Sequence, residues 1–470
     1  MCTKKSFAFL LLLRVGLSLG AQTVGEPHEL SAIAGGQHRN IVFDTALAVG
    51  EVTVSNVFMN LATRYVGHAP FADVTFESIE MNFQRASWGW EKWDRFQVNQ
   101  IGHPYQGSTY FAAGRANGFS FYPSILFAVL GSYTWEVFFE SQSPSTNDVV
   151  VTTIGGTVMG EMAHRLFLEI NSRRSVTRTV GSTLVSPTDR VHQVITRAKR
   201  PGRSNIHSAV VYLGVNGAHA RFHEAGKEVD SWDGAALHMG ADIVYGNPFD
   251  QRSFIPYEQF ELSARFSFGS PLNYEAAILS DGYLLSFSPL VGDVSRGSTG
   301  LSFNFDFFNT TNDLMDNRGH GNINFAAYGL DWTFKYRRYL WGDVTLEAKA
   351  HAGWTALGFA NYIAIAGEDT GDYGMGWNAK LFLTLVHPRW GKLAAQTQVY
   401  RMESIPTIAP RALGTTSFYA YDVSLSHPLT KRFSLGAGYW EFILTGEYDG
   451  KAPDMNRRIR NYRVYGAWKL

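Results

Sequence analysis

The chain has 470 residues, a formal net charge of +0, 17% charged residues and 14% aromatic residues. Soluble domains carry about 25% charged residues, and a neutral chain offers no electrostatic reason to expect nucleic acid as a partner. The single cysteine, Cys2, excludes a disulfide framework within the chain. Low charge together with 46 glycines is typical of a transmembrane β-barrel with aromatic girdles, and a large soluble β-sandwich or barrel is the alternative.

Residues 1–21 have the pattern of a secretory signal peptide. Lys4 and Lys5 precede an apolar stretch, which Arg14 interrupts, and small residues follow up to Ala21. We therefore expect an exported protein. Residues 22–89 form an N-terminal segment in which a helix competes with a strand pair, because a helical period coexists with many β-branched residues.

Residues 90–170 are expected to form a helical domain around an uncharged run from Ala116 to Trp135, which is long enough to span a bilayer. Glycines 155, 156 and 160 would allow close helix contacts. Residues 171–204, rich in Arg, Ser and Thr, are expected to be a linker. The expected helices lie around Asn99 with a break near Gly102-His103-Pro104, from Ser108 to Ala116, from Ser124 to Ser141, and after the cap candidates Ser145–Asp148.

From residue 205 to residue 470 the apolar period changes to two. Leu330, Trp332 and Phe334, for example, alternate with Asp331, Thr333 and Lys335. Such alternation indicates strands with one apolar and one polar face. In a membrane barrel the apolar face meets lipid, whereas in a soluble sandwich it points inward.

Turn lengths favour the barrel. Short connections at 340–343, 387–390 and 427–430 separate longer loops at about 355–374, 402–416 and 447–458. The last strand ends at Leu470 with Tyr462, Val464 and Trp468 on one face, which resembles an outer-membrane insertion signal. The predicted fold class is α+β: a helical domain that plugs or caps the barrel, then an antiparallel transmembrane β-barrel of about 12 strands at residues 205–470 in the bacterial outer membrane. A weaker alternative places 116–135 and 147–166 across the inner membrane.

Residues 90–166 also carry a family resemblance. The residues that match are Asp94, Phe96, Asn99, His103-Pro104-Tyr105, Gly107, Tyr110-Phe111, Arg115, Gly118, Trp135-Glu136, Glu140, Pro144, Asn147-Asp148, Thr152, Gly155-Gly156, Gly160-Glu161 and Arg165. They resemble the bacterial envelope proteins grouped as domain of unknown function 3943. The chain departs from that pattern at Trp90–Trp93 and at Gln106, where a second histidine is usual. The resemblance implies a shared architecture and no reaction.

Glu136 and Glu140 would share one face of a helix, where two like charges repel. If buried, they need a proton or a cationic partner, such as Arg115, His103, His164 or Arg165. A structural network of ion pairs and hydrogen bonds explains such a cluster as well as chemistry does.

Three further patterns are weaker. Glu161 and His164 have the Glu-x-x-His spacing of di-iron bundles, so Glu136, Glu140, Glu161 and His164 are candidate metal ligands. A hydrolase trio of Ser108 or Ser124 with His103 and Asp148 lacks a Gly-x-Ser-x-Gly elbow. Gly155, Gly156 and Gly160 follow no βα turn and do not form a dinucleotide fingerprint.

Two functional hypotheses follow. The first is a structural or transport role for a barrel whose partners are the lipid bilayer and the outer-membrane insertion machinery. The second is a membrane-embedded enzyme, a hydrolase or a metal-dependent one, acting on an envelope lipid or a small molecule, with no cofactor specified. His103 or a glutamate would act as base and Arg115 would hold an anionic group. Its candidate catalytic residues are His103, Arg115, Glu136, Glu140, Asp148 and Glu161.

Overall fold

The computed structural model describes residues 40–84, 88–90, 96–172, 175–197, 205–249, 253–270, 274–311, 322–365, 368–405, 413–449 and 453–470. They form two compact units, one helical and one a β-barrel, which divide between Ser204 and Asn205. The signal peptide expected over residues 1–21 lies outside the described residues.

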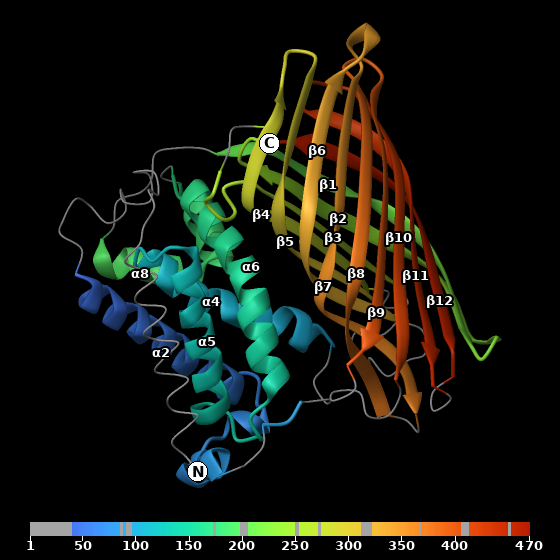
Figure 1. The fold of residues 1–470 in the computed structure, drawn as a ribbon. Helices are drawn as coiled ribbons and strands as arrows, with labels where there is room; N and C mark the ends of the chain where they lie inside the picture. Colours follow the sequence, from blue (N-terminus) through green and yellow to red (C-terminus); the bar gives the residue numbers. More distant parts are fainter. Residues whose placement is uncertain are drawn as a thin grey trace. The chain divides into compact units, whose positions relative to one another are not determined.

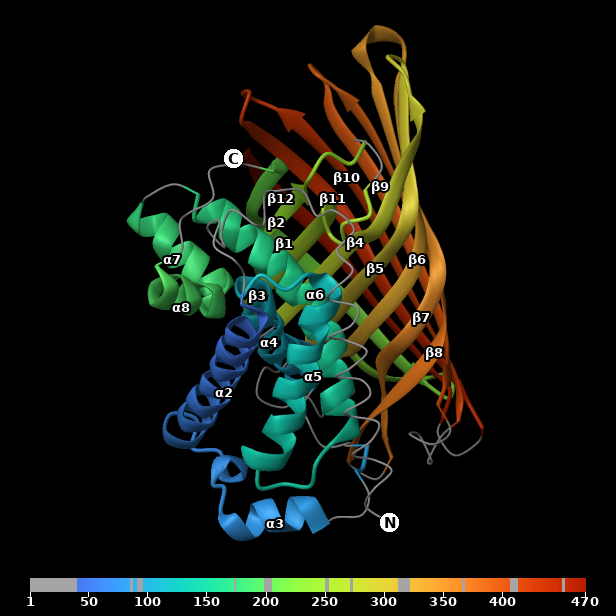
Figure 2. The ribbon, with the colours of Figure 1, turned by 60° about the vertical axis from the view of Figure 1, so that its left-hand side comes forward.

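The helical unit is built around three helices, α4, α5 and α6, which pack on one another (Figure 2). Asn40 caps α2 by accepting hydrogen bonds from the backbone N–H groups of Val42 and Phe43. Its helices are α2 (Ile41–Tyr65), α3 (Phe76–Gln84), α4 (His103–Ala116), α5 (Phe121–Phe138), α6 (Thr146–Ile170), α7 (Val176–Val185) and α8 (Pro187–Thr196), with short turns of helix at Pro70–Ala72 and Val98–Gly102.

Helices α4 and α6 meet at glycines. A Cβ atom on Gly107 would lie 1.9 Å from the carbonyl oxygen of Thr152, and one on Gly156 would lie 2.4 Å from the carbonyl carbon of Gly107. A Cβ on Gly160 would lie 2.8 Å from the ring of Phe111. The two backbones therefore touch, which only glycine permits. The expectation of close helix contact is confirmed for Gly156 and Gly160.

Several expected helix boundaries are wrong. Pro104 lies in the first turn of α4, where a missing N–H group costs nothing, so α4 begins at His103 rather than at Ser108. Helix α5 ends at Phe138, which leaves Glu140 beyond the helix. Residues 41–65, for which a strand pair was the alternative, form one helix.

The linker expected over residues 171–204 is also wrong for most of its length. It contains helices α7 and α8, which pack against α6 and α4 respectively. The high Ser, Thr and Arg content suggested a linker, but these helices bury their polar residues: Ser182, Ser186, Thr188, Asp189 and His192 are all buried.

The barrel unit is a closed antiparallel sheet in which β1 pairs with β12 (Figure 1). Within the described residues it has 12 strands, as expected, although residues 355–365 and 368–374, expected in a loop, continue β7 and β8. The strands are β1 (Ile206–Glu224), β2 (Lys227–Tyr245), β3 (Phe260–Ser270), β4 (Tyr274–Val291), β5 (Ser295–Thr311), β6 (Ile323–Tyr339), β7 (Thr345–Ile365), β8 (Glu368–His387), β9 (Gly391–Ser404), β10 (Gly414–Pro428), β11 (Phe433–Tyr448) and β12 (Met455–Lys469).

The two faces of the barrel wall differ sharply. In β6, Asp331, Thr333 and Lys335 are buried in the interior, whereas Trp332 and Phe334 are exposed on the outside. The outer face exposes a broad apolar belt, and this is the pattern of a transmembrane barrel. Other exposed members of the belt are Leu213, Val215, Leu237, Trp354, Trp377, Leu381, Leu383, Leu385, Leu393, Val423, Leu425, Leu435, Tyr462, Val464 and Trp468.

The ends of the barrel are defined by its connections. We call the end where β1 begins and β12 ends the terminal end, and it also holds the turns at 292–294, 340–344, 388–390 and 429–432. We call the opposite end the loop end. There, Ala225 and Gly226 join β1 to β2 with positive φ angles of 46° and 75°, as a tight hairpin requires.

Substituting Gly156 by Ala should destabilise the helical unit by about 1–3 kcal/mol, because the added methyl group has no space against the α4 backbone. The far-UV circular dichroism of the helices during thermal unfolding measures the change. The matched control is Gly50→Ala in α2, where a Cβ atom meets nothing within 4 Å. The control should stabilise the helix by about 0.5–1 kcal/mol, and equal melting of the two variants would contradict the packing argument.

Candidate functional site

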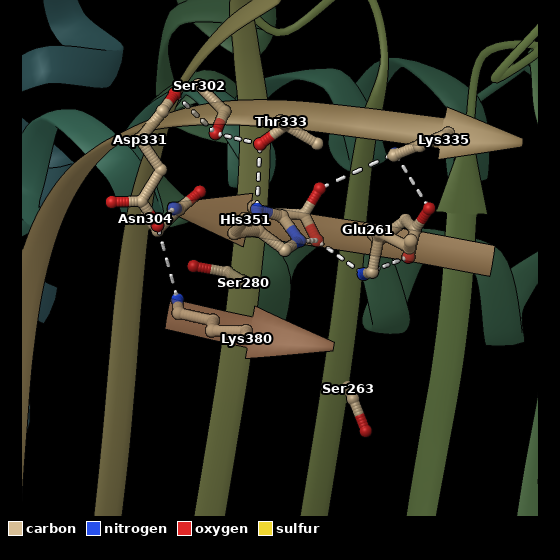
Figure 3. Close-up of polar contacts among 12 residues, drawn as sticks. Glu261, Ser263, Ser280, Ser302, Asn304, Asp331, Thr333, Lys335, His351 and Lys380 are labelled. Atoms are coloured by element: carbon tan, nitrogen blue, oxygen red, sulfur yellow. Dashed lines mark hydrogen bonds and ion pairs between the residues drawn. The ribbon is translucent and has the colours of Figure 1, made fainter. Parts of the chain in front are cut away.

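The barrel interior holds charged groups that pair across the lumen. The Nζ atom of Lys335 on β6 lies 2.7 Å from Glu261 on β3, and that of Lys349 on β7 lies 2.6 Å from the same carboxylate. Asp281 on β4 completes the set, 2.7 Å from Lys349. Figure 3 shows Lys335 and Glu261 reaching toward each other from separate strands. Because β3 and β6 are not neighbours in the sheet, this ion pair crosses part of the lumen.

A second group lies nearby. Lys380 on β8 forms an ion pair with Asp306 on β5, and its Nζ atom is 3.7 Å from Asp331. Asn378 donates a 2.8 Å hydrogen bond to Asp331. Figure 3 shows Lys380 and Asp331 facing each other. A buried charge is tolerated only when it is paired and hydrogen-bonded, and these contacts provide both.

A third group joins opposite walls. Asp422 on β10 accepts from Arg265 on β3 at 2.7 Å and also from Arg463 on β12. Both guanidinium groups lie over the ring of Trp440, at 4.6 Å and 5.2 Å from its centroid. Since β3 and β10 lie on opposite sides of the ring of strands, this ion pair spans the lumen.

Aromatic side chains fill the lumen nearer the loop end. We call Phe308, Phe325, Phe418, Trp440 and Phe442 the lumen aromatic cluster. The rings of Phe325 and Phe418 stack at 4.2 Å, and Phe308 on β5 meets Phe442 on β11 at 5.3 Å. All five are almost fully buried. Strands β5 and β11 face each other across the barrel, so these contacts close the lumen at this level.

A cavity of about 740 Å³ lies in the lumen beside these charged groups. Its lining runs from the terminal-end turn residues His387 and Thr430 down to Asp306 and Lys380. The described lumen is therefore a charged vestibule at the terminal end and an aromatic closure toward the loop end.

The candidate catalytic residues of the helical unit take part in structural contacts. The backbone N–H of Ser145 donates to Glu136 at 2.7 Å, and Ser145 Oγ donates to Asn147 at 2.7 Å. Asn147 in turn donates to Asp148 at 2.8 Å, and Asp148 lies 3.5 Å from His103 Nε2. This chain of contacts joins the start of α6 to the end of α5 and the start of α4.

Glu161 and Arg115 form the second set. Glu161 is fully buried, and it lies 2.8 Å from Arg115 on α4 and 2.7 Å from Arg165 on α6. Burial alone would raise the pKa of Glu161, but Arg115 and Arg165 lower it by more, so the net pKa lies below its usual range. Glu161 therefore stays ionised between two guanidinium groups and fastens α4 to α6.

The remaining candidates have partners as well. His164 lies 2.7 Å from Asp189 on α8, and Glu140 accepts a 3.0 Å hydrogen bond from the indole of Trp135. Glu136 and Glu140 do not share a helix face, since Glu140 follows the end of α5. Among the described residues, no group of three or more His, Cys, Asp or Glu side chains could hold a metal ion.

Residues 87–215 match the family model of a domain of unknown function, DUF3943. The resemblance predicted from residues 90–166 is confirmed. The DUF3943 match extends beyond those residues through α7 and α8 and into β1, so it takes in most of the segment that the sequence suggested was a linker.

The other comparisons are less informative than the DUF3943 match. No curated protein matches the chain. Among solved structures, the chain is similar to the toluene transporter TodX of Pseudomonas putida (12% identity, 56% of this chain and 89% of that chain, TM-score 0.23). It is also similar to the NanC porin (12% identity, 55% of this chain and 100% of that chain, TM-score 0.25). A third similar structure is the translocator domain of the autotransporter NalP from Neisseria meningitidis (11% identity, 56% of this chain and 88% of that chain, TM-score 0.27). Similarity at this level says nothing about what this chain binds or transports.

The lumen ion pairs are not singled out by the sequence, although Glu261, Lys335 and Lys349 lie on the polar faces of expected strands. Glu261 and Lys335 lie 74 positions apart in the chain. Strand alternation places both on polar faces, but only the closure of the barrel turns those faces inward and brings the two side chains together. The DUF3943 residues, by contrast, were recognised from local spacing.

Lowering the pH should destabilise the helical unit through Glu161. Its folded pKa is lowered below the unfolded value of about 4.3. The stability contributed by its ionised form is therefore present above that pH and lost as the pH falls through the folded pKa. Thermal melting of the helices between pH 6 and pH 2 measures the loss.

Glu161→Gln should remove this part of the pH dependence of stability. It should also lower the free energy of unfolding at pH 7 by about 3–5 kcal/mol, because two buried guanidinium groups lose their charge partner. Glu77→Gln on the exposed surface of α3 is the matched control and should leave both quantities unchanged. An unchanged pH profile in Glu161→Gln would contradict the assignment.

Lys380→Met should destabilise the barrel by about 3–5 kcal/mol, because Asp306 and Asp331 would be left without their cation in the interior. Urea unfolding in detergent, followed by the loss of the folded band on an unheated gel, measures the change. Lys392→Met, at an exposed site on β9, is the control. Equal stability of the two variants would show that the lumen pair contributes little.

Proposed function

We propose that the protein is an outer-membrane β-barrel with a structural role, which anchors its DUF3943 domain at the membrane and whose own lumen is closed. The observation that carries this proposal is the lumen aromatic cluster, which joins opposite walls of the barrel. An open pore needs a continuous polar path, and the cluster interrupts that path.

Placement in the outer membrane rests on the barrel itself. A closed sheet satisfies every backbone group within lipid, and an even number of strands brings both barrel termini to one end, which in such proteins faces the periplasm. The expected signal peptide supports export. The lipid bilayer and the outer-membrane insertion machinery are the partners that this proposal requires.

The helical domain is proposed to be a periplasmic cap and not a plug inside the barrel. The lumen is already occupied by cross-lumen ion pairs and by the lumen aromatic cluster. The DUF3943 helices also have their own tightly packed interior, centred on the contact between Gly107 and Gly156.

A transport role is the second candidate, and the cavity favours it. The vestibule of about 740 Å³ is large enough for a small polar solute, and its charged groups offer both signs for binding. Passage would then require the lumen aromatic cluster to separate, so transport would be gated.

Reconstituted wild-type protein should show no steady conductance in planar bilayers. Phe308→Ala combined with Phe418→Ala should open a path and produce channels, because it removes two rings that bridge the lumen. Phe334→Ala, which shortens an exposed ring on the outer face, is the control and should stay silent.

Each outcome separates the candidates. Steady conductance of the wild type would contradict a closed lumen. A folded double variant that stays silent would exclude the cluster as a gate and leave the structural role. Because each buried Phe→Ala change costs about 3–5 kcal/mol, the gel shift of the folded barrel must accompany the recordings.

A further inference from the structure

Helices α7 and α8 carry an aliphatic face that no described part of the chain covers. On α7, Val176, Val180 and Leu184 stand four positions apart and form one stripe. Their side chains are 81%, 53% and 72% exposed. On α8, Val194 and Ile195 are exposed to a similar degree.

The opposite face of the same helices is polar and buried. Ser182 lies against α7's own backbone, and Asp189 accepts from Ser186 Oγ at 2.6 Å while pairing with His164 of α6. His192 lies 2.8 Å from Glu51 of α2. The pair is therefore inverted relative to a soluble helix, with polar groups inside and aliphatic groups outside.

Helix α2 has the same inversion. Glu51 and Asn56 are buried, whereas Val54 and Phe58 are exposed. Among the described helices, α2 is long and apolar enough to cross a membrane by length and composition. Exposing apolar surface to water is unfavourable by roughly 25 cal/mol per Å². The aliphatic face of α7 and α8 is therefore expected to be covered.

Chain connectivity indicates what covers it. Arg197, at the end of α8, and Asn205, at the start of the barrel, stand eight positions apart. A fully extended chain of that length reaches roughly 30 Å at most. A helix pair tied this closely to a membrane-spanning strand stays within reach of the lipid surface. An amphipathic helix with an aliphatic face and flanking arginines, here Arg178 and Arg197, is suited to lie in that surface.

We propose that the aliphatic face of α7 and α8 is a lipid-binding surface, which lies in the interface of the membrane that holds the barrel. The inference rests on the proposed membrane barrel. Its ligand class is the acyl-chain boundary of a bilayer. The alternative occupants are a second copy of the chain or another protein surface, and accessibility measurements distinguish both from lipid.

The test uses full-length protein, reconstituted at a high lipid-to-protein ratio in phosphatidylethanolamine and phosphatidylglycerol vesicles. The chain has one cysteine, Cys2, inside the expected signal peptide. Leu184→Cys and Val194→Cys would each carry a nitroxide label. Collision rates with oxygen, which concentrates in lipid, and with a water-soluble nickel complex are then compared. Glu77→Cys on exposed α3 is the water control, and Leu237→Cys on the outer face of β2 is the lipid control.

For the labels at Leu184 and Val194, the ratio of the collision rate with oxygen to that with nickel should be several-fold higher than for the label at Glu77. The Leu237 label should show a similarly high ratio. Nickel access equal to that of Glu77 would overturn the proposal, because the face would lie in water. Protection from both reagents would also overturn it, because protein would then cover the face. A water-exposed Leu237 label would instead overturn the membrane barrel itself.

Discussion

The hydrogen-bonded ladder between β1 and β12 is the contact on which the barrel depends. It converts a long sheet into a closed wall, so every described strand is hydrogen-bonded to a neighbour on each side. Closure also divides every strand into an outer and an inner side chain row. The outer row is free to be apolar because lipid surrounds it, whereas the inner row must satisfy its own polar groups. The ion pairs and the aromatic closure are two ways in which this chain fills that enclosed space.

The lumen contacts join strands on opposite walls of the barrel. Arg265 and Asp422 join strands that are far apart in the ring, and Phe308 and Phe442 do the same with apolar surface. Charged contacts and aromatic contacts have different effects on what can enter the lumen. A charged pair can bind a polar solute when its partner moves, while packed rings exclude water and ions. Their succession along the lumen makes the terminal end the accessible side and the loop end the closed side.

The helical unit differs from a soluble helix bundle in what it buries and what it exposes. Its interior is held by Glu161 between Arg115 and Arg165 and by glycine contacts between α4 and α6, and part of its surface is aliphatic. The six candidate catalytic residues all form hydrogen bonds or ion pairs within the helical unit. An aliphatic surface of this kind suits a domain that lies against lipid. The burial of Ser, Thr and Asp residues in α7 and α8 explains why the composition of that segment indicates a linker.

Local patterns in the sequence were sufficient for the fold class, the twelve strands, their faces and the DUF3943 resemblance. Strand alternation and turn spacing depend on neighbouring residues, and those can be read directly. The partners of Glu261 and Lys335, the meeting of Phe308 with Phe442, and the burial of polar residues in α7 and α8 could not be read in that way. They join segments distant in the chain, and barrel closure and helix packing alone determine which of the many inward-facing groups meet.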